Sequence, residues 1–246
     1  MTLGIIVDIL IVGLFVFYIH KNKKTTQLRC ALETVCYIVS IALSTPIAIK
    51  LSQLAYDSFF RAAIAKKLEK IVSVGSHAYF SSGYNVVMQQ MPSMVKNASA
   101  SYGIMTQENV DKVNTLVRTG SNTSALEITD IVAKPVIQGV FRAVFFIILF
   151  FAFLFLLKAL AATFENLLYT PDRVTINTAL CGAFGAFKAI VVLIFTITVI
   201  QFMLPAIWST SLETTSIFNS SFLFRLFYHN NVVMLFLGKG IYPVAM

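Results

Sequence analysis

Charged residues are scarce in this chain, and acidic residues are the scarcest of them. Only 12% of its 246 residues are charged, with 11 Asp and Glu against 19 Lys and Arg, so the formal net charge is +8. A typical soluble domain carries about 25% charged residues. The low charged fraction, an apolar fraction of 57% and a mean hydropathy of +0.79 exclude an ordinary soluble domain and indicate a membrane protein.

Cysteine is also rare, and the three cysteines form an odd-numbered set: Cys30, Cys36 and Cys181. They lie at or inside the apolar runs, and no CxxC spacing occurs. An odd number without such spacing argues against a disulfide framework and against a zinc site. We expect all three side chains to be small, buried hydrophobic groups.

The sequence has no recognisable catalytic motif. It lacks HExxH, GxSxG, GxGD, a glycine-rich phosphate loop and a Cys/His cluster, and its three histidines are widely separated. A serine–lysine dyad of Ser44 or Ser52 with Lys50 stays open, although single polar residues in an apolar helix are more often packing features. We therefore predict a protein that is not an enzyme and that has no catalytic, cofactor-binding or metal-binding residues.

Four apolar stretches are long enough to cross a bilayer. The hydrocarbon core is about 30 Å thick and needs roughly 20 mostly apolar residues in a helix, which satisfies its own backbone groups. The stretches run from Leu3 to Ile19, from Ala31 to about Leu54, from Val136 to Ala162 and from Ala179 to about Ile207. The first lacks a basic leading segment and a cleavage site, so we expect a retained helix. The sequence predicts an all-α integral membrane protein with four transmembrane helices.

Basic residues between the first two stretches predict the orientation. Lys21, Lys23, Lys24 and Arg29 occur there without an acidic residue, and short basic loops stay on the cytoplasmic side. Four spans then place the N-terminus, the long segment 55–135 and the C-terminus outside. Contact with anionic lipid explains the positive charge better than nucleic-acid binding, because the basic residues are scattered along the flanks of the apolar stretches. The lipid bilayer is therefore the first expected partner.

The segment 55–135 is more polar, yet it keeps a helical pattern. Apolar residues recur at helical spacing from Phe60 to Ile71, and basic residues from Arg61 to Lys70 occupy much of the opposite side. This amphipathic helix either lies on the bilayer surface or continues the second span, and we favour the continuation.

Further helix starts follow within the same segment, at Pro92, near Thr106 and near Ser124. They predict a small cap of short helices inserted between the second and third spans. The expected organisation has four parts: residues 1–54 with the basic loop, the cap at 55–135, the third and fourth spans at 136–208, and an extracytoplasmic amphipathic tail at 209–246.

Two ionisable residues lie well inside the apolar stretches, where an unpaired charge costs several kcal/mol. Asp8 is early in the first stretch, and Lys188 is roughly 15 Å into the fourth. Because the two helices enter from opposite sides, these side chains could pair in the bundle interior. Alternatively, Lys188 extends to the nearer interface and Asp8 caps the outer end of its own helix. Arg142 and Lys158 lie nearer to helix ends, and we expect them only to anchor these ends.

Small residues recur along one face of the fourth stretch, at Ala179, Gly182, Ala183, Ala186 and Ala189. A face of small residues lets another helix backbone approach closely in a membrane. The stripe predicts either a tight helix pair or oligomer seam, or ordinary packing within the chain.

The same region carries a pattern that resembles a known family. Asn177, Leu180, Gly185 and Lys188 are spaced as in the fourth helix of the colicin V production proteins, and Asp8 matches an acidic residue early in that family's first helix. The long segment before the third stretch and the serine-containing tail are similar to those of longer members. The chain departs from the family pattern at Thr178, Cys181, Gly182 and Ala189.

The resemblance implies a non-enzymatic protein of the bacterial inner membrane that supports toxin production, secretion or cell-envelope homeostasis. Asp8, Asn177, Gly182, Gly185 and Lys188 are carried over only as motif or packing positions, and no cofactor is implied. The expected partners are a second copy of the chain or an envelope or secretion protein that binds the outer cap. The alternative is a small transporter or channel with a polar path near Asp8, Asn177 and Lys188.

Overall fold

A computed structural model gives the fold and describes residues 2–23, 26–74, 83–99, 104, 106–119, 122–168, 178–207, 220–231, 233 and 237. These residues are helical almost throughout, and none of them is in a strand. The helical fold class predicted from the sequence is therefore confirmed. The chain divides into two compact units: unit 1 comprises Met1–Ala48, Phe145–Val199 and Glu213–Leu237, and unit 2 comprises Ile49–Val144, Ile200–Leu212 and Gly238–Met246.

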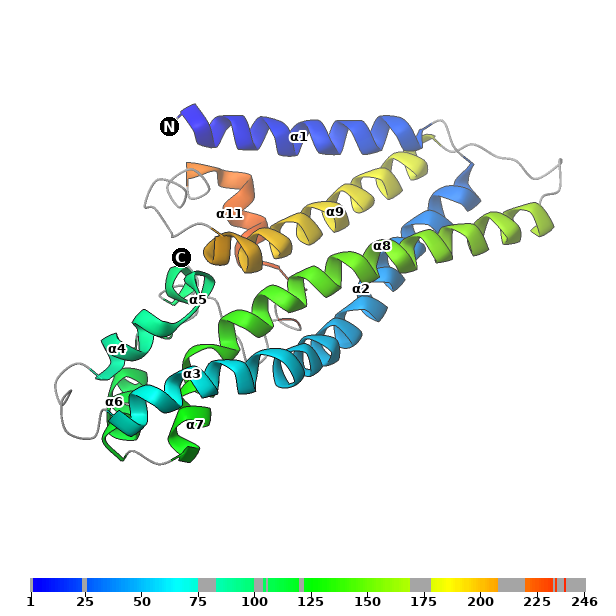
Figure 1. Ribbon diagram of the computed structural model, residues 1–246. Coiled ribbons are helices and arrows are strands. Elements are labelled where there is room, and N and C mark those ends of the chain that lie inside the picture. The colour runs from blue at the N-terminus through cyan, green and yellow to red at the C-terminus, as the bar shows by residue number, and fades with distance from the viewer. Residues whose placement is uncertain are drawn as a thin grey trace. The chain divides into compact units, whose positions relative to one another are not determined.

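The four longest helices correspond to the four predicted apolar stretches (Figure 1). They are α1 (Thr2–Asn22), α2 (Gln27–Ala55), α8 (Lys134–Leu168) and α9 (Thr178–Ile207). By length and composition, segments that start in these helices are able to cross a membrane: Gly4–Asn22, Gln27–Lys70, Lys134–Phe164 and Thr178–Met203. The prediction of four long apolar helices is confirmed.

The second of these segments runs through three consecutive elements. A π-helix, η1 (Tyr56–Phe60), follows α2 directly and leads into α3 (Arg61–Val74). The amphipathic helix predicted from Phe60 onward is thus a continuation of the second apolar helix, which is the alternative that the sequence favoured.

Helix α1 is apolar on its exposed side as well as on its packed side. Ile9 is 63% exposed and Leu10 is 68% exposed, although large aliphatic side chains of soluble proteins are mostly buried. A helix that is apolar all round is typical of a membrane span or of the core of a large protein.

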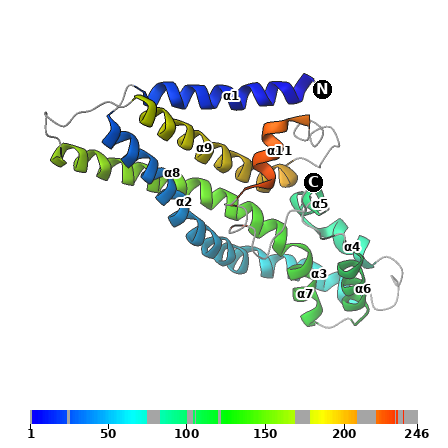
Figure 2. The ribbon, with the colours of Figure 1, turned by 180° about the vertical axis from the view of Figure 1, so that it is seen from behind.

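Aromatic side chains form part of the core of unit 1. The Phe150 and Phe195 rings stack with 4.3 Å between centroids, and the Phe146 and Phe195 centroids are 5.4 Å apart. Tyr37 lies 6.3 Å from Phe150 by the same measure. These contacts join α2, α8 and α9 within the unit, and α1 lies alongside α9 in both views (Figures 1 and 2).

Unit 2 contains the shorter helices: α4 (Gly83–Gln90), α5 (Ser93–Ala98), α6 (Gln107–Thr119) and α7 (Asn122–Val132). Helix α3 contacts α4 and α7, and α6 contacts α4 and α7. The core of the unit includes fully buried Leu68, Val113 and Ile128. Pro92 precedes α5, and the Thr106 hydroxyl accepts a hydrogen bond from the Asn109 N–H at the start of α6, as expected of residues that open helices.

Tyr84 illustrates the packing of these short helices. Its N–H donates to the Asn114 side-chain oxygen at 2.9 Å, which ties the start of α4 to α6. Its ring is 6% exposed, and burial raises the pKa of the Tyr84 hydroxyl.

Candidate functional site

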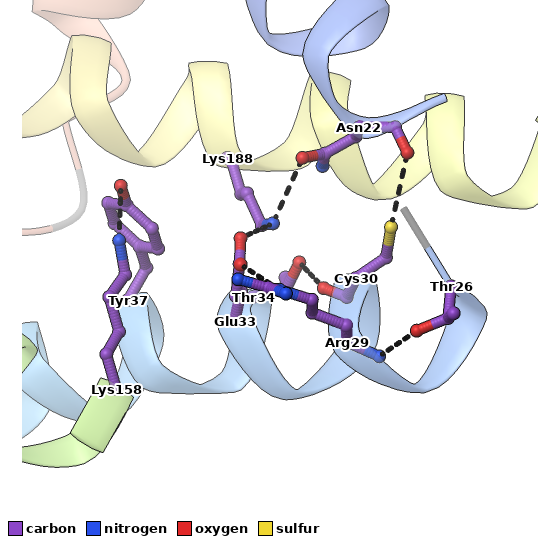
Figure 3. A network of polar contacts seen from close by, with 9 residues as sticks. All are labelled: Asn22, Thr26, Arg29, Cys30, Glu33, Thr34, Tyr37, Lys158 and Lys188. Carbon is purple, nitrogen blue, oxygen red and sulfur yellow. Dashed lines mark hydrogen bonds and ion pairs between the residues drawn. The ribbon is translucent and has the colours of Figure 1, made fainter. Parts of the chain in front are cut away.

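A group of charged side chains gathers in unit 1 near the start of α2 (Figure 3). It consists of Arg29 and Glu33 from α2, Lys158 from α8 and Lys188 from α9, and we call these four residues the charged cluster. Asn22 at the end of α1 and Tyr37 of α2 bind to it (Figure 3). Residues from four helices therefore meet at one place.

Lys188 is the most deeply buried member of the charged cluster. It is 1% exposed, and its Nζ lies 2.7 Å from Glu33 Oε2 and 3.2 Å from Asn22 Oδ1. Its position in α9, which starts at Thr178, places it roughly 15 Å along the helix. A buried ammonium is tolerated only when it is paired and hydrogen-bonded, and Glu33 and Asn22 meet this requirement from two other helices.

Glu33 connects the buried part of the charged cluster to its exposed part. One carboxylate oxygen accepts from Lys188, and the other accepts from Arg29 Nε at 3.2 Å across one turn of α2. The side chain of Glu33 is 27% exposed and that of Arg29 is 56% exposed. A single carboxylate thus bridges an ammonium in the core and a guanidinium at the surface.

Lys158 completes the charged cluster from α8. Its Nζ lies 3.4 Å from the Tyr37 hydroxyl and 4.8 Å from the centroid of the Tyr37 ring, so the cation also faces the aromatic ring. A pocket of about 100 Å³ lies beside these groups. Its lining residues are Arg29, Leu32, Glu33, Lys158, Ala161 and Ala162.

Asp8 lies in unit 1 but binds a different group of residues. Its carboxylate accepts from the Ser221 hydroxyl at 2.6 Å and from the N–H groups of Phe222 and Leu223 at 3.2 and 2.9 Å. These donors are at the start of α11 (Phe222–His229), where Ser221 also accepts from the Phe224 N–H. Asp8 therefore caps the N-terminus of α11, where a negative charge is favourable.

The predicted pairing of Asp8 with Lys188 is wrong, and so are both parts of the alternative. Lys188 binds Asn22, which lies roughly 21 Å along α1 from Asp8 at 1.5 Å per residue. The two charges are thus satisfied near opposite ends of α1. Lys188 is buried rather than extended to an interface, and Asp8 caps α11 rather than its own helix.

Gly185 of α9 lies directly against the backbone of α1. A Cβ placed on Gly185 would lie 2.6 Å from the Tyr18 carbonyl oxygen and 2.9 Å from Ile19 Cα, which leaves no room for a side chain. A Cβ on Gly182 would instead meet Ile19 and Lys23 side-chain atoms at 3.7 and 3.6 Å, which are ordinary contacts. The small-residue pattern thus serves packing within the chain at these two glycines.

The predicted stripe of small residues is only partly correct. Ala179 and Ala183 are exposed, whereas Cys181 and Ala189 are buried together with Gly182, Gly185 and Lys188. The packed face of α9 is therefore rotated relative to the expected one, and it includes Gly185, which lies against the α1 backbone. Asn177, the remaining motif position, lies outside the described residues.

Arg142 and Lys158 are the two residues of α8 that are expected to anchor helix ends. Arg142 is 2% exposed and lies roughly 12 Å along α8 from the start of this helix. Gln138, one turn earlier in the same helix, is 3% exposed. Lys158 binds Tyr37 and belongs to the charged cluster. Lys158 therefore has a contact within the protein, and the anchoring of helix ends by these two residues stays a prediction.

A second polar group lies in unit 2, beside the π-helix. Asp130 of α7 accepts two hydrogen bonds from Arg61, at 3.1 and 2.6 Å, and one from the Tyr56 hydroxyl at 2.9 Å. Tyr56 is fully buried. Two-point binding of a guanidinium to a carboxylate is strong and directional, so this group holds α7 against the junction of η1 and α3.

The three cysteines that were predicted to be buried are buried thiols. Ser44 and Ser52 donate to the carbonyl groups of Ile41 and Ile49 in their own helix, and Lys50 is exposed. Within the described part of the chain, no group of three or more His, Cys, Asp or Glu side chains is placed to hold a metal ion.

The sequence interpretation missed Glu33, Asn22 and Tyr37. Glu33 had a signal of its own, since it is the sole acidic residue between Asp8 and Asp57 and lies inside the second apolar stretch. A charge at such a position needs a partner. Asn22 and Tyr37 have no comparable signal, because each gains its role only from the packing of distant helices.

No protein-family model, curated protein or solved structure matches the chain. The resemblance to colicin V production proteins therefore stays a prediction that rests on the sequence positions Asp8, Asn177, Leu180, Gly185 and Lys188. The structure shows a buried ion pair, a pocket beside it and a short helix with a capped N-terminus, all in unit 1.

Proposed function

We propose that the chain is a multi-pass, non-enzymatic protein of the bacterial inner membrane. In this proposal it supports secretion, toxin production or envelope homeostasis, as its resemblance to colicin V production proteins implies. In the sequence, short helices of unit 2 follow α2 and precede α8. In the proposal, these helices bind an envelope partner or a second copy of the chain outside the membrane. The observation that supports a structural, non-enzymatic role is the buried ion pair between Lys188 and Glu33.

The ion pair supports a structural role for the charges inside the apolar helices. Lys188 uses Glu33 and Asn22 as partners, so its ammonium is satisfied within the protein. Paired charges of this kind connect neighbouring helices and define their register in an apolar environment.

The alternative, a transporter with a polar path near Asp8 and Lys188, has less support. The two residues bind separate partners near opposite ends of α1, so they do not line one continuous path through their contacts. A flux measurement separates the two functions. In liposomes containing the purified protein, we expect no uptake of ions or small solutes above that of empty liposomes, and uptake that Lys188→Ala abolishes would contradict the proposal.

Partner binding is tested by photocrosslinking the full-length protein in bacterial cells. A photoreactive residue in place of Lys112, which is exposed on α6, is expected to form discrete adducts with protein. The matched control replaces Ile9, which is exposed on apolar α1 and is expected to face lipid. Equal adduct patterns at the two positions would show that the unit 2 helices have no specific partner.

A further inference from the structure

We propose that the pocket between α2 and α8 binds the phosphate group of an anionic phospholipid. The proposal rests on the membrane location proposed above. The pocket measures about 100 Å³, and a water molecule takes about 30 Å³ in the liquid, so a small polyatomic anion fits. Two cationic side chains, Arg29 and Lys158, line it from different helices (Figure 3).

The charges around the pocket favour an anion. The carboxylate of the charged cluster, Glu33, already accepts from both Lys188 and Arg29. Lys158 contacts the hydroxyl and ring of Tyr37, and no carboxylate of the described residues lies within ion-pair distance of it. A cationic group among apolar helices is costly unless an anion is close to it, and a phosphate bound beside Lys158 lowers this cost.

The donors match a phosphate. A lysine ammonium has three N–H donors, of which the Tyr37 hydroxyl uses one, so Lys158 keeps donors for a ligand. Arg29 adds a second positive charge to the lining of the pocket. Glu33 does not prevent binding, because its charge is compensated by the buried ammonium of Lys188.

The position of the pocket favours a lipid over a soluble anion. Arg29 lies close to the start of the apolar segment Gln27–Lys70, and Lys158 lies roughly 9 Å from the end of the segment Lys134–Phe164. Leu32, Ala161 and Ala162 give the pocket an apolar wall, and nearby Leu28 and Leu160 are 43% and 49% exposed. Basic pockets between membrane helices at this level bind lipid headgroups, with the acyl chains along the apolar surface.

The experiment uses the full-length protein in a neutral detergent and measures lipid binding by native mass spectrometry. Phosphatidylglycerol is compared with phosphatidylcholine of the same acyl chains. We expect preferential binding of phosphatidylglycerol, with an affinity that falls about fivefold in Lys158→Gln. Lys21→Gln is the control, since it removes one exposed positive charge from α1 without touching the pocket.

A second variant keeps the charges and fills the pocket. Ala161→Leu adds volume to the pocket wall and is expected to weaken phosphatidylglycerol binding as well. If Lys158→Gln does not fold, as judged by its melting temperature without added lipid, Ala161→Leu decides the question. Equal binding of the two lipids, or equal effects of Lys158→Gln and Lys21→Gln, would overturn the proposal.

Inorganic phosphate distinguishes the two sources of the anion. We expect millimolar phosphate to leave phosphatidylglycerol binding nearly unchanged, whereas complete displacement would assign the pocket to a soluble anion and overturn the lipid assignment. Alkaline washing of isolated membranes tests the proposed membrane location separately from the lipid site. Protein that stays in the membrane after alkaline washing but binds both lipids equally contradicts only the lipid site, whereas protein released by the wash contradicts both.

Discussion

Lys188 and Glu33 are 155 positions apart in the sequence and meet with 2.7 Å between Nζ and Oε2. Lys188 is 1% exposed, so its ammonium depends on this contact and on the Asn22 side-chain oxygen. The pair joins the start of α2 to α9 in unit 1. Because a buried ion pair is most sensitive to the loss of one partner, it gives the sharpest stability prediction for the protein.

Removing both members of the pair should cost less than the two single removals added together. We expect Lys188→Met or Glu33→Gln to lower the free energy of unfolding by about 3 kcal/mol, because each breaks the buried ion pair by removing one of its two charges. The double variant should be less destabilised than the sum of the two. Denaturation in mixed detergent micelles measures all three.

The matched control for these three variants is Glu108→Gln in α6. Glu108 binds Lys112 across one helical turn, but both side chains are exposed, and the nearby ammonium lowers the pKa of Glu108. Exposed pairs of this kind contribute little to stability, so we expect no measurable change. Strict additivity of Lys188→Met and Glu33→Gln would contradict the assignment of the buried pair.

The two glycines of α9 should respond differently to alanine. A methyl group on Gly185 meets the Tyr18 carbonyl oxygen at 2.6 Å, which is backbone and cannot rotate away. We expect Gly185→Ala to destabilise the protein by about 2 kcal/mol, as overpacking does. Gly182→Ala meets only side-chain atoms at ordinary distances and should be neutral or slightly stabilising. Equal melting temperatures for the two variants would argue against the close contact of α9 with α1.

Asp8 should stabilise α11 by binding its N-terminus. Asp8→Ala removes the acceptor for three donors at the start of this helix, whereas the Ser221 hydroxyl still accepts from the Phe224 N–H. We expect amide hydrogen exchange in α11 to accelerate roughly fivefold, as for a lost helix cap. Exchange in α6, which lies in unit 2, serves as the internal reference. An unchanged rate in α11 would mean that Asp8 does not cap it.

Two buried tyrosines in unit 2 offer a matched comparison. The Tyr56 hydroxyl donates to Asp130 at 2.9 Å, so Tyr56→Phe should cost about 1 kcal/mol. The Tyr84 hydroxyl is buried without a hydrogen-bond partner among the described residues, so Tyr84→Phe should be neutral or stabilising. Thermal unfolding measures the stability of the two variants. A larger loss of stability for Tyr84→Phe than for Tyr56→Phe would contradict these hydrogen-bond assignments.

The long apolar helices could be predicted from the sequence because each apolar stretch is a local property. The run from Val136 to Ala162, for example, lies within the observed segment Lys134–Phe164. The continuation of the second helix into α3 was also predictable, since no helix-breaking residue separates Phe60 from the segment before it.

The charged cluster could not be predicted in full, because its contacts depend on how distant helices pack. The burial of Lys188 follows from its position in α9, but its partner follows from the contact of Gly185 with Tyr18, which places Lys188 beside Asn22 instead of Asp8. Asp8 in turn binds α11, whose position relative to α1 has no local signal in the sequence. Glu33 is the exception, since its isolation as an acidic residue in an apolar stretch already called for a partner.

The most direct test of the proposed multi-pass topology is cysteine labelling in intact cells. Cys30, Cys36 and Cys181 are replaced by alanine, and single cysteines are introduced as Asn97→Cys in α5 and as Lys21→Cys at the end of α1. We predict that a membrane-impermeant maleimide labels position 97 in intact spheroplasts and position 21 only after permeabilisation. Labelling of position 21 but not of position 97 before permeabilisation would contradict the proposed orientation.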